Sequence, residues 1–279
     1  MEPRGLRIAL RVWVGIVLAF LFIPIALIVL YAFNKSNIDS WPIPSFTLHW
    51  FSVAWHDSQV RSAFLVSIKV ALISMVLALI LGSAVAYAVH SFKFFGREAI
   101  SLMLVLPLAL PGIITGIALN SMFAFTGIQF GTLTIVIGHT TFCIVVVFNN
   151  VIARLRRMSG SLNEASMDLG ARGWQTLRLV TLPMLATALV SGALLAFALS
   201  FDEVIVTVFT AGAQNTLPLW IFGAIRLGQQ LPEVNVVVTF VIALTIIPVV
   251  VAARIAGAGA ITRSARNVPV TTAGAGFTG

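Results

Sequence analysis

The sequence predicts an all-α, polytopic membrane protein with six transmembrane helices, and three observations support this. Of its 279 residues, 59% are hydrophobic and only 9% are charged, and the mean hydropathy is +1.04. Such a composition is typical of an integral membrane protein and excludes an ordinary soluble domain. The apolar runs reach about 20 residues without strict alternation, which favours helices over a barrel. A helix also satisfies its own backbone hydrogen bonds in lipid.

Six apolar windows are long enough to cross a bilayer. We predict spans at residues 8–33, 62–90, 99–125, 131–153, 184–210 and 234–254. The first window follows Arg4, Arg7 and Arg11 as a signal peptide would, but it runs about 25 residues without a clear cleavage site, so we expect a retained span. We therefore expect a transmembrane domain over residues 1–255. The tail at 256–279 is rich in Gly, Ala and Thr, and we expect it to be a disordered cytoplasmic segment.

The distribution of the basic residues indicates that the net charge of +8 reflects the topology of the chain in the membrane. Thirteen of the 17 Lys and Arg residues fall in segments that the predicted spans place on one side: Arg4, Arg7, Arg11, Lys93, Arg97, Arg154, Arg156, Arg157, Arg172, Arg178, Arg254, Arg263 and Arg266. This is the positive-inside bias, and it predicts that both termini are cytoplasmic. We therefore expect the protein to reside in a lipid bilayer and not to bind nucleic acid.

Two features of the predicted spans concern their packing. Pro107 and Pro111 interrupt the third span, and proline kinks a helix, so this span either lines a pore or is bent only for packing. Small residues spaced four apart allow helices to approach closely. The pairs are Gly82 with Ala86 and Gly192 with Ala196.

Two predicted external segments carry aromatic residues. Residues 34–61 contain Trp50 and a short helical pattern that Ser45 or Thr47 can cap. Such aromatics form either an interfacial belt or an outer lid that touches a partner. In the second segment, Pro218 suits the first turn of a short helix that lies on or re-enters the membrane.

The cytoplasmic segment 154–183 is too long for an ordinary helix connection. Ser161 and Glu164 match a capping box, which predicts a helix that begins at Ser161. Gly170 can adopt the left-handed conformation that ends a helix. A second helical piece is expected to end at Pro183.

A motif within this segment identifies a family. It reads Glu164-Ala165-Ser166, three residues, Gly170, nine residues, Val180, one residue, Leu182-Pro183. It resembles the coupling loop of bacterial ABC-importer permeases of the binding-protein-dependent type, with Ser166 in place of Ala and Val180 in place of Ile. The resemblance implies a type I ABC-importer permease fold in the bacterial cytoplasmic (inner) membrane. It also implies that an ATPase docks on Glu164, Ala165, Ser166, Asp168, Gly170, Leu182 and Pro183.

The sequence also indicates what this chain does not carry. It contains no G-x-x-x-x-G-K-[ST] run, so ATP and Mg²⁺ are expected on a separate ATP-binding subunit dimer. No Cys/His cluster suggests a metal, and no nucleophile–base arrangement suggests an enzyme. Six spans are few for a pathway, so we expect a second permease subunit. The resemblance adds an extracytoplasmic solute-binding protein.

Two acids interrupt the fifth predicted span in the run Ser200-Phe-Asp202-Glu203. A carboxylate at membrane depth costs about 2.5–3.5 kcal/mol on insertion scales, so such residues usually face water or a partner. They either line the path of a cationic solute, pair with Lys69, or lie near the external interface. An ion-coupled secondary transporter that uses Asp202 and Glu203 as a proton relay, or a membrane scaffold, is the competing class. The coupling motif argues against both.

The same acids carry a closer resemblance. Ser200-Phe-Asp-Glu, Leu217-Pro218 and Pro232-Glu-Val-Asn235 resemble the PotC-like permeases of spermidine/putrescine importers. This resemblance implies that Ser200, Asp202, Glu203 and Trp50 belong to a polyamine pathway. Related permeases move other small solutes on similar scaffolds, so another solute is the alternative.

Overall fold

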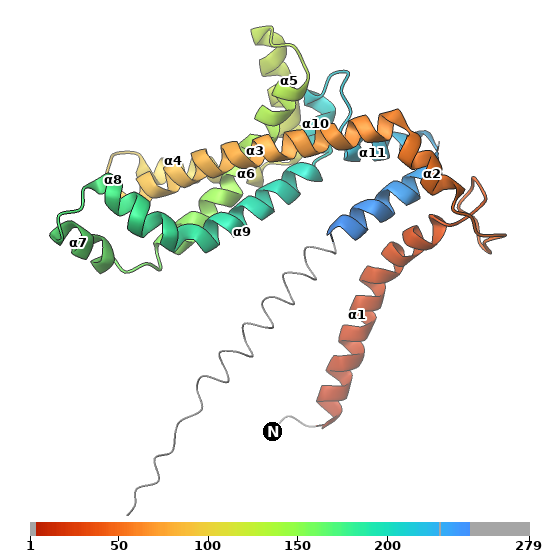
Figure 1. Cartoon of the computed structure of the whole chain (residues 1–279), viewed down its shortest axis with the longest axis horizontal. Helices are drawn as coiled ribbons and strands as arrows, with labels where there is room; N and C mark the ends of the chain where they lie inside the picture. The colour runs from red at the N-terminus through yellow and green to blue at the C-terminus, as the bar shows by residue number, and fades with distance from the viewer. Residues whose placement is uncertain (1–3, 229, 246–279) are drawn as a thin grey trace, which may run out of the picture. The chain divides into compact units, whose positions relative to one another are not determined.

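The structure, a computed structural model, describes residues 4–228 and 230–245. Within those residues the chain is helical, and its only β-type pairing is a single bridge between Asn34 and Phe46 (Figure 1). The chain divides into two compact units, Met1–Ala54 with Gln230–Gly279, and Trp55–Gln229. Each unit is described by itself below. The all-α prediction is confirmed.

The first unit consists of α1, part of α2, and a late helix. Its elements are α1 Arg4–Tyr31, the start of α2 His49–His56, and the helix Leu231–Thr245. The Thr47 hydroxyl accepts a hydrogen bond from the His49 N–H at 3.1 Å, so Thr47 caps α2 as predicted. The Phe51 ring lies 5.0 Å from that of Phe33 and 5.8 Å from that of Phe240. These ring contacts tie α2 to the chain that follows α1 and to the late helix.

The second unit is a bundle of broken and continuous helices. Its elements are α3 Ser58–Ser91, α4 Arg97–Ala109, α5 Gly112–Thr126, α6 Thr132–Leu155, α7 Ser161–Asp168, α8 Gly173–Thr176, a π-helix Leu177–Thr181, α9 Leu182–Phe201, α10 Ile205–Thr210 and α11 Leu217–Leu227. The central helix is α6, which packs against α3, α4, α5, α9 and α10. Figure 1 shows α7 and α8 together at one end of this bundle.

Small residues bring α3, α6 and α9 close together, as predicted. A β-carbon at Gly82 on α3 would lie 2.9 Å from the Ile144 carbonyl oxygen and 3.0 Å from the Val147 Cβ on α6. At Gly192 on α9, the nearest atom to such a β-carbon would be the Val147 Cα, at 3.6 Å. Because lipid offers helices no hydrophobic drive to associate, this close van der Waals contact holds them together.

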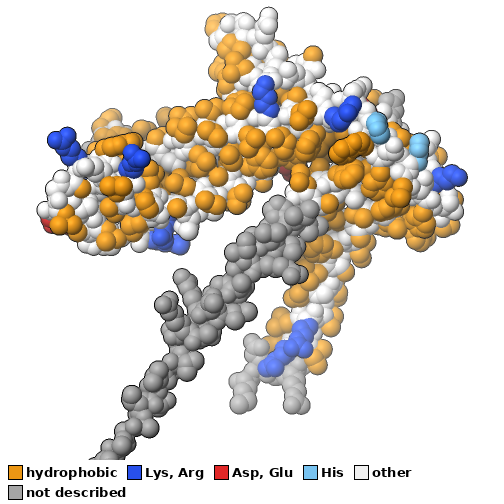
Figure 2. Space-filling view, viewed as in Figure 1, with side chains coloured by type: hydrophobic (Ala, Val, Ile, Leu, Met, Phe, Trp, Pro, Cys, Tyr) orange, Lys and Arg blue, Asp and Glu red, His pale blue; other side chains and the backbone are white. Residues whose placement is uncertain are grey.

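Four helices in the described residues are long and apolar enough to cross a membrane: Gly5–Tyr31, Ser58–Ser91, Thr132–Leu155 and Gly173–Phe201. They correspond to the first, second, fourth and fifth predicted spans. Figure 2 shows hydrophobic side chains over the visible face of the long helices of the second unit, while several Lys and Arg side chains lie at the end that carries α7 and α8. Such surfaces suit helices surrounded by lipid.

The third predicted span is two helices, α4 and α5, rather than one kinked helix. Leu110, between them, has φ −78° and ψ 142°. A residue before proline is disfavoured in the α region, because the Pro111 ring clashes with its backbone, and this ends α4. Pro107 lies inside α4 without ending it. The sixth predicted span is described only as Leu231–Thr245, and its remainder and the tail at 256–279 lie outside the described residues.

The expectation that a helical piece ends at Pro183 is wrong. The chain stays helical from Gly173 to Phe201, and Pro183 lies in the first turn of α9. A π-helical turn precedes it, in which the Leu182 N–H donates to the Leu177 carbonyl, five residues back. The wider turn relieves the clash that a proline ring makes with the carbonyl four residues before it.

Candidate functional site

The coupling segment begins with α7, whose start differs from the prediction. The N-cap residue is Gly160, and the first helical hydrogen bond runs from the Glu164 N–H to the Gly160 carbonyl at 3.2 Å. The Ser161 hydroxyl instead lies 2.5 Å from the Ser159 hydroxyl. The predicted capping box is therefore wrong, because Ser161 is already inside the helix.

The end of α7 follows the prediction closely. Gly170 has φ +85°, the left-handed conformation that glycine adopts without strain. The Ala171 N–H donates to the Ser166 carbonyl at 3.1 Å, and the Gly170 N–H donates to the Met167 carbonyl at 2.8 Å. This pair of bonds is a Schellman motif. Gly170 therefore turns the chain from α7 towards α8.

A chain of polar side chains holds α7 against the elements that follow it. The Ser166 hydroxyl lies 2.8 Å from the Thr176 hydroxyl, and the Thr181 hydroxyl donates to the Asn163 side-chain oxygen at 3.4 Å. Thr176 and Thr181 are both buried. Thr181 directly precedes Leu182 and Pro183, so these contacts link α7 to the start of α9. The Ser166 hydroxyl thus contacts its own chain.

The outer surface of α7 and α8 carries large apolar side chains that are exposed. Leu162 is 46% exposed, Leu169 is 90% exposed and Trp174 is 68% exposed. Glu164, Ala165 and Asp168 are also exposed. Large apolar side chains grouped at the polar end of a membrane protein mark a surface for another protein.

The second candidate region is a pair of neighbouring helix breaks. A β-carbon at Gly112, which follows the α4–α5 break, would lie 3.5 Å from Ile205, which follows the α9–α10 break. Further along, the Asn120 side-chain amide donates to the Phe209 carbonyl at 2.7 Å. Non-helical backbone at membrane depth is tolerated only inside protein or beside a water-filled cavity. The two neighbouring breaks therefore indicate a place in the bundle where the backbone is either enclosed by protein or faces a water-filled cavity.

The acids lie in the α9–α10 break and not within a continuous helix, as the fifth predicted span had placed them. The Asp202 backbone N–H closes α9 by donating to the Ala198 carbonyl, while its side chain is exposed. The Glu203 carboxylate accepts a hydrogen bond from the Val206 N–H at 3.0 Å and so caps α10. Neither acid forms an ion pair with Lys69 within the part of the chain described.

Behind the acids lies a buried histidine that the sequence analysis missed. His139 on α6 is 1% exposed, and its Nδ1 lies 2.8 Å from the Ser200 hydroxyl. Its Nε2 lies 2.8 Å from the Thr207 hydroxyl, which donates to the Glu203 carbonyl at 2.7 Å. The imidazole therefore joins both sides of the break. A polar ring within the apolar fourth span was the available signal.

Trp50 belongs to the first unit, whereas Ser200 and the acids belong to the second. Its indole N–H donates to the Asn34 carbonyl at 3.0 Å. Asn34 is fully buried, and its side chain donates to Ile38 and accepts from Ser36. In this structure Trp50 thus helps to hold the segment between α1 and α2 in place.

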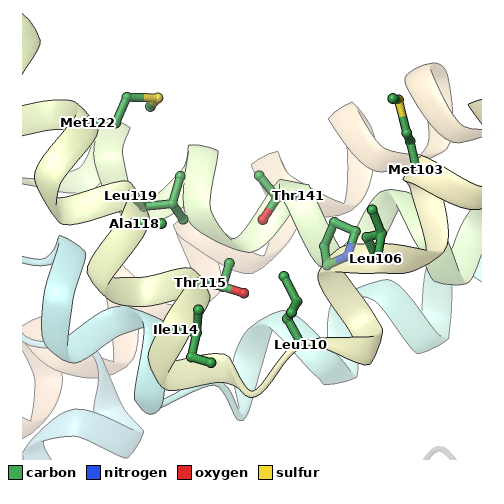
Figure 3. A pocket seen from close by; sticks show the side chains of 10 residues that line it. Met103, Leu106, Leu110, Ile114, Thr115, Ala118, Leu119, Met122 and Thr141 are labelled. Atoms are coloured by element: carbon green, nitrogen blue, oxygen red, sulfur yellow. The ribbon is translucent and has the colours of Figure 1, made fainter.

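An apolar hollow of about 320 Å³ lies at the α4–α5 break. Figure 3 shows Met103 and Leu106 from α4, Ile114, Thr115, Leu119 and Met122 from α5, and Thr141 from α6 around it. The Thr115 hydroxyl is buried and has no hydrogen-bond partner within the described residues. The lining carries no charge, so this hollow does not suit a cation.

Comparison with known proteins decides the family. Residues 78–259 match the family described as binding-protein-dependent transport system inner membrane component. The chain belongs to this family. It is a permease subunit of an ABC importer, a multi-pass membrane protein and not itself an enzyme. Membership implies an ATPase partner and a substrate-binding protein, and it removes the secondary-transporter and scaffold alternatives.

Individual relatives agree with this assignment. The permease is 34% identical to the spermidine/putrescine permease PotC of Haemophilus influenzae, over 84% of this chain and 91% of the relative. It is 34% identical to the putrescine permease PotI of Escherichia coli, over 80% and 82%. A bacterial ABC transporter that imports the acidic polysaccharide alginate shares the fold, with a TM-score of 0.66 at 19% identity, over 92% of this chain and 98% of that one.

Proposed function

We propose that the permease forms half of a transmembrane pathway for polyamines such as spermidine and putrescine. Its relatives named for polyamine transport support this, as do the acids in the α9–α10 break. The observation that carries the proposal is Asp202, an exposed carboxylate with no ion pair within the described residues, at a break in an apolar bundle. A carboxylate there is costly unless it meets water or a cation.

The two acids take different roles in this proposal. Glu203 is engaged in capping α10, so its carboxylate is partly satisfied without a solute. Asp202 is free to replace some of the water around an ammonium group as the polyamine loses hydration. The attraction between the Asp202 carboxylate and the ammonium group grows as the local dielectric constant falls. Asp202 is therefore the main cation ligand, and Glu203 contributes beside it. The pathway roles predicted for Ser200 and Trp50 stay predictions.

Uptake of labelled spermidine and putrescine tests this assignment. Asp202→Asn should reduce uptake strongly and Glu203→Gln less, while membrane levels and ATPase binding stay normal. Asp202→Glu keeps the charge and is the matched control, which should retain more uptake than Asp202→Asn. Normal transport of both polyamines by Asp202→Asn and Glu203→Gln would refute the cationic cargo.

We further propose that an ATPase dimer, which binds the ATP and Mg²⁺, docks on the outer surface of α7 and α8. Glu164, Ala165, Asp168 and Gly170 form or shape that surface. Ser166, Leu182 and Pro183 act from inside, because the Ser166–Thr176 and Thr181–Asn163 contacts join α7 to α9. These polar contacts between α7 and the start of α9 suit the transfer of rigid-body motion from the ATPase to the transmembrane helices.

Docking can be separated from folding with two variants. Leu169→Ser removes a 90% exposed apolar side chain without changing the backbone, whereas Gly170→Val strains a residue at φ +85°. Both should weaken co-purification of the ATPase and uncouple ATP hydrolysis from uptake. Wild-type co-purification by both variants would place the docking surface elsewhere.

The second half of the pathway is proposed to be a different permease chain. Two differently tagged copies of this chain, expressed with the other importer subunits, should then not co-purify with each other. We also propose that both termini are cytoplasmic and that residues 34–61 are external. Labelling from outside intact cells should modify a cysteine at Ser40 but not one at Ser264, which lies outside the described residues. The reverse labelling would overturn this orientation.

A further inference from the structure

A basic hollow lies at the same end of the second unit as the coupling segment. It has a volume of about 670 Å³ and opens between the end of α3, the start of α4 and the end of α6. We use the name basic hollow for the site lined by Val89, Lys93, Arg97, Glu98, Ser101 and Arg156. Its lining includes no residue of the helix breaks or of α7.

The charges around the basic hollow are unbalanced. Lys93, Arg97 and Arg156 contribute three cations, and Glu98 is the single carboxylate in its lining. In the described part of the chain, none of the three cations forms an ion pair. The first turn of α4 also has no side-chain cap, and its residues Arg97, Glu98 and Ala99 line the same space. The hollow thus repels a polyamine and attracts an anion.

The rim of the basic hollow is aromatic and open. Phe94 and Phe95 line it, and Phe95 is fully exposed while Phe94 is 40% exposed. Both follow α3, whose 34 residues span about 51 Å at 1.5 Å per residue. A bilayer with its headgroups is about 40–45 Å thick, so a helix of this length reaches through both headgroup regions. Apolar rings there can reach acyl chains while the cations meet phosphate.

We propose that the basic hollow binds the phosphate headgroup of an anionic phospholipid in the leaflet nearest the coupling segment. Basic pockets between transmembrane helices on the cytoplasmic side are suited to such headgroups. The aromatic rim selects a lipid over a free phosphate, because a free phosphate gains nothing from exposed phenylalanine. Arg156 directly follows α6 and precedes α7 by five residues, so the bound lipid joins α4 to the chain entering the coupling segment.

Lipid retention by the full-length permease in its transporter complex tests the proposal. The purified complex is exchanged into detergent with equal amounts of phosphatidylglycerol and phosphatidylcholine, and the retained lipids are quantified by mass spectrometry. The wild type should be enriched in phosphatidylglycerol. Each of Lys93→Gln, Arg97→Gln and Arg156→Gln should lower that enrichment about fivefold, the effect of one basic residue at an anionic surface.

The matched control removes cations at the same end of the bundle. Arg157→Gln with Arg178→Gln deletes two exposed arginines that do not line the basic hollow, and it should leave the enrichment nearly unchanged. Arg156→Gln alone keeps the test valid if Lys93→Gln or Arg97→Gln does not fold. Equal loss in the control, unchanged enrichment in the Arg156 variant, or displacement of the lipid by millimolar inorganic phosphate would each overturn the proposal.

Discussion

Replacing Gly82 with alanine places a methyl group against the backbone of α6. The new carbon would lie 2.9 Å from the Ile144 carbonyl oxygen and 3.0 Å from the Val147 Cβ, where ordinary contacts begin near 3.4 Å. The obstacle is backbone and the root of a β-branched side chain, so neither can rotate away. Accepting the methyl group therefore requires α3 and α6 to separate by roughly half an ångström, the scale on which packed contacts lose a quarter or more of their energy.

The matched substitution at Gly192 has no such conflict. Its nearest neighbour is the Val147 Cα at 3.6 Å, an ordinary contact distance. Both alanines gain about 1 kcal/mol of helix propensity over glycine. Only Gly82→Ala also suffers the overpacking cost of about 1–3 kcal/mol. We therefore expect Gly82→Ala to be less stable than Gly192→Ala by about 1–3 kcal/mol, with a Tm several degrees lower.

The assay is thermal unfolding of the detergent-purified importer, followed by loss of the monodisperse peak on fluorescence-detected size-exclusion chromatography. Glycine, alanine and leucine at position 82 should rank in that order of decreasing Tm, since larger side chains demand more separation. Equal Tm values for Gly82→Ala and Gly192→Ala would refute the inference that the α3–α6 approach limits stability.

Three further outcomes follow from the hydrogen bonds. His139→Phe removes the shared partner of the Ser200 and Thr207 hydroxyls. Thr207 keeps its bond to the Glu203 carbonyl, whereas the buried Ser200 hydroxyl is left unsatisfied at a cost of about 1–3 kcal/mol, so Tm and polyamine uptake should both fall, and an unchanged Tm would count against the bridge. Ser166→Ala removes the bond to Thr176, worth about 1 kcal/mol, and should speed tryptic cleavage within the coupling segment; unaltered cleavage would show that the bond does not hold α7. Trp50→Phe removes the bond to the Asn34 carbonyl and should cost about 1 kcal/mol of stability, whereas a loss of uptake with normal Tm would assign Trp50 to the pathway directly.

Much of this permease was predictable because its signals are local. Apolar runs report which segments enter lipid, so the long helices α1, α3, α6 and α9 were found from composition alone. Gly170 was correctly assigned as a helix end, since the left-handed conformation suits few other residues. The motif from Glu164 to Pro183 identified the family, and the small-residue pairs marked the close packing at Gly82 and Gly192.

Only the tertiary structure decided how the polar groups within the bundle are satisfied. His139 reaches Ser200 and Thr207, which follow it by more than 60 residues, and Ser166 turns towards Thr176 rather than towards a partner. Periodicity describes one helix at a time, so it cannot reveal these partners. The break at the acids has the same origin: Glu203 gains a new helix to cap because α10 packs beside α5 and α6. Sequence therefore determined which segments enter the membrane, whereas contacts between distant segments determined where the helices break and which side chains remain free for a solute.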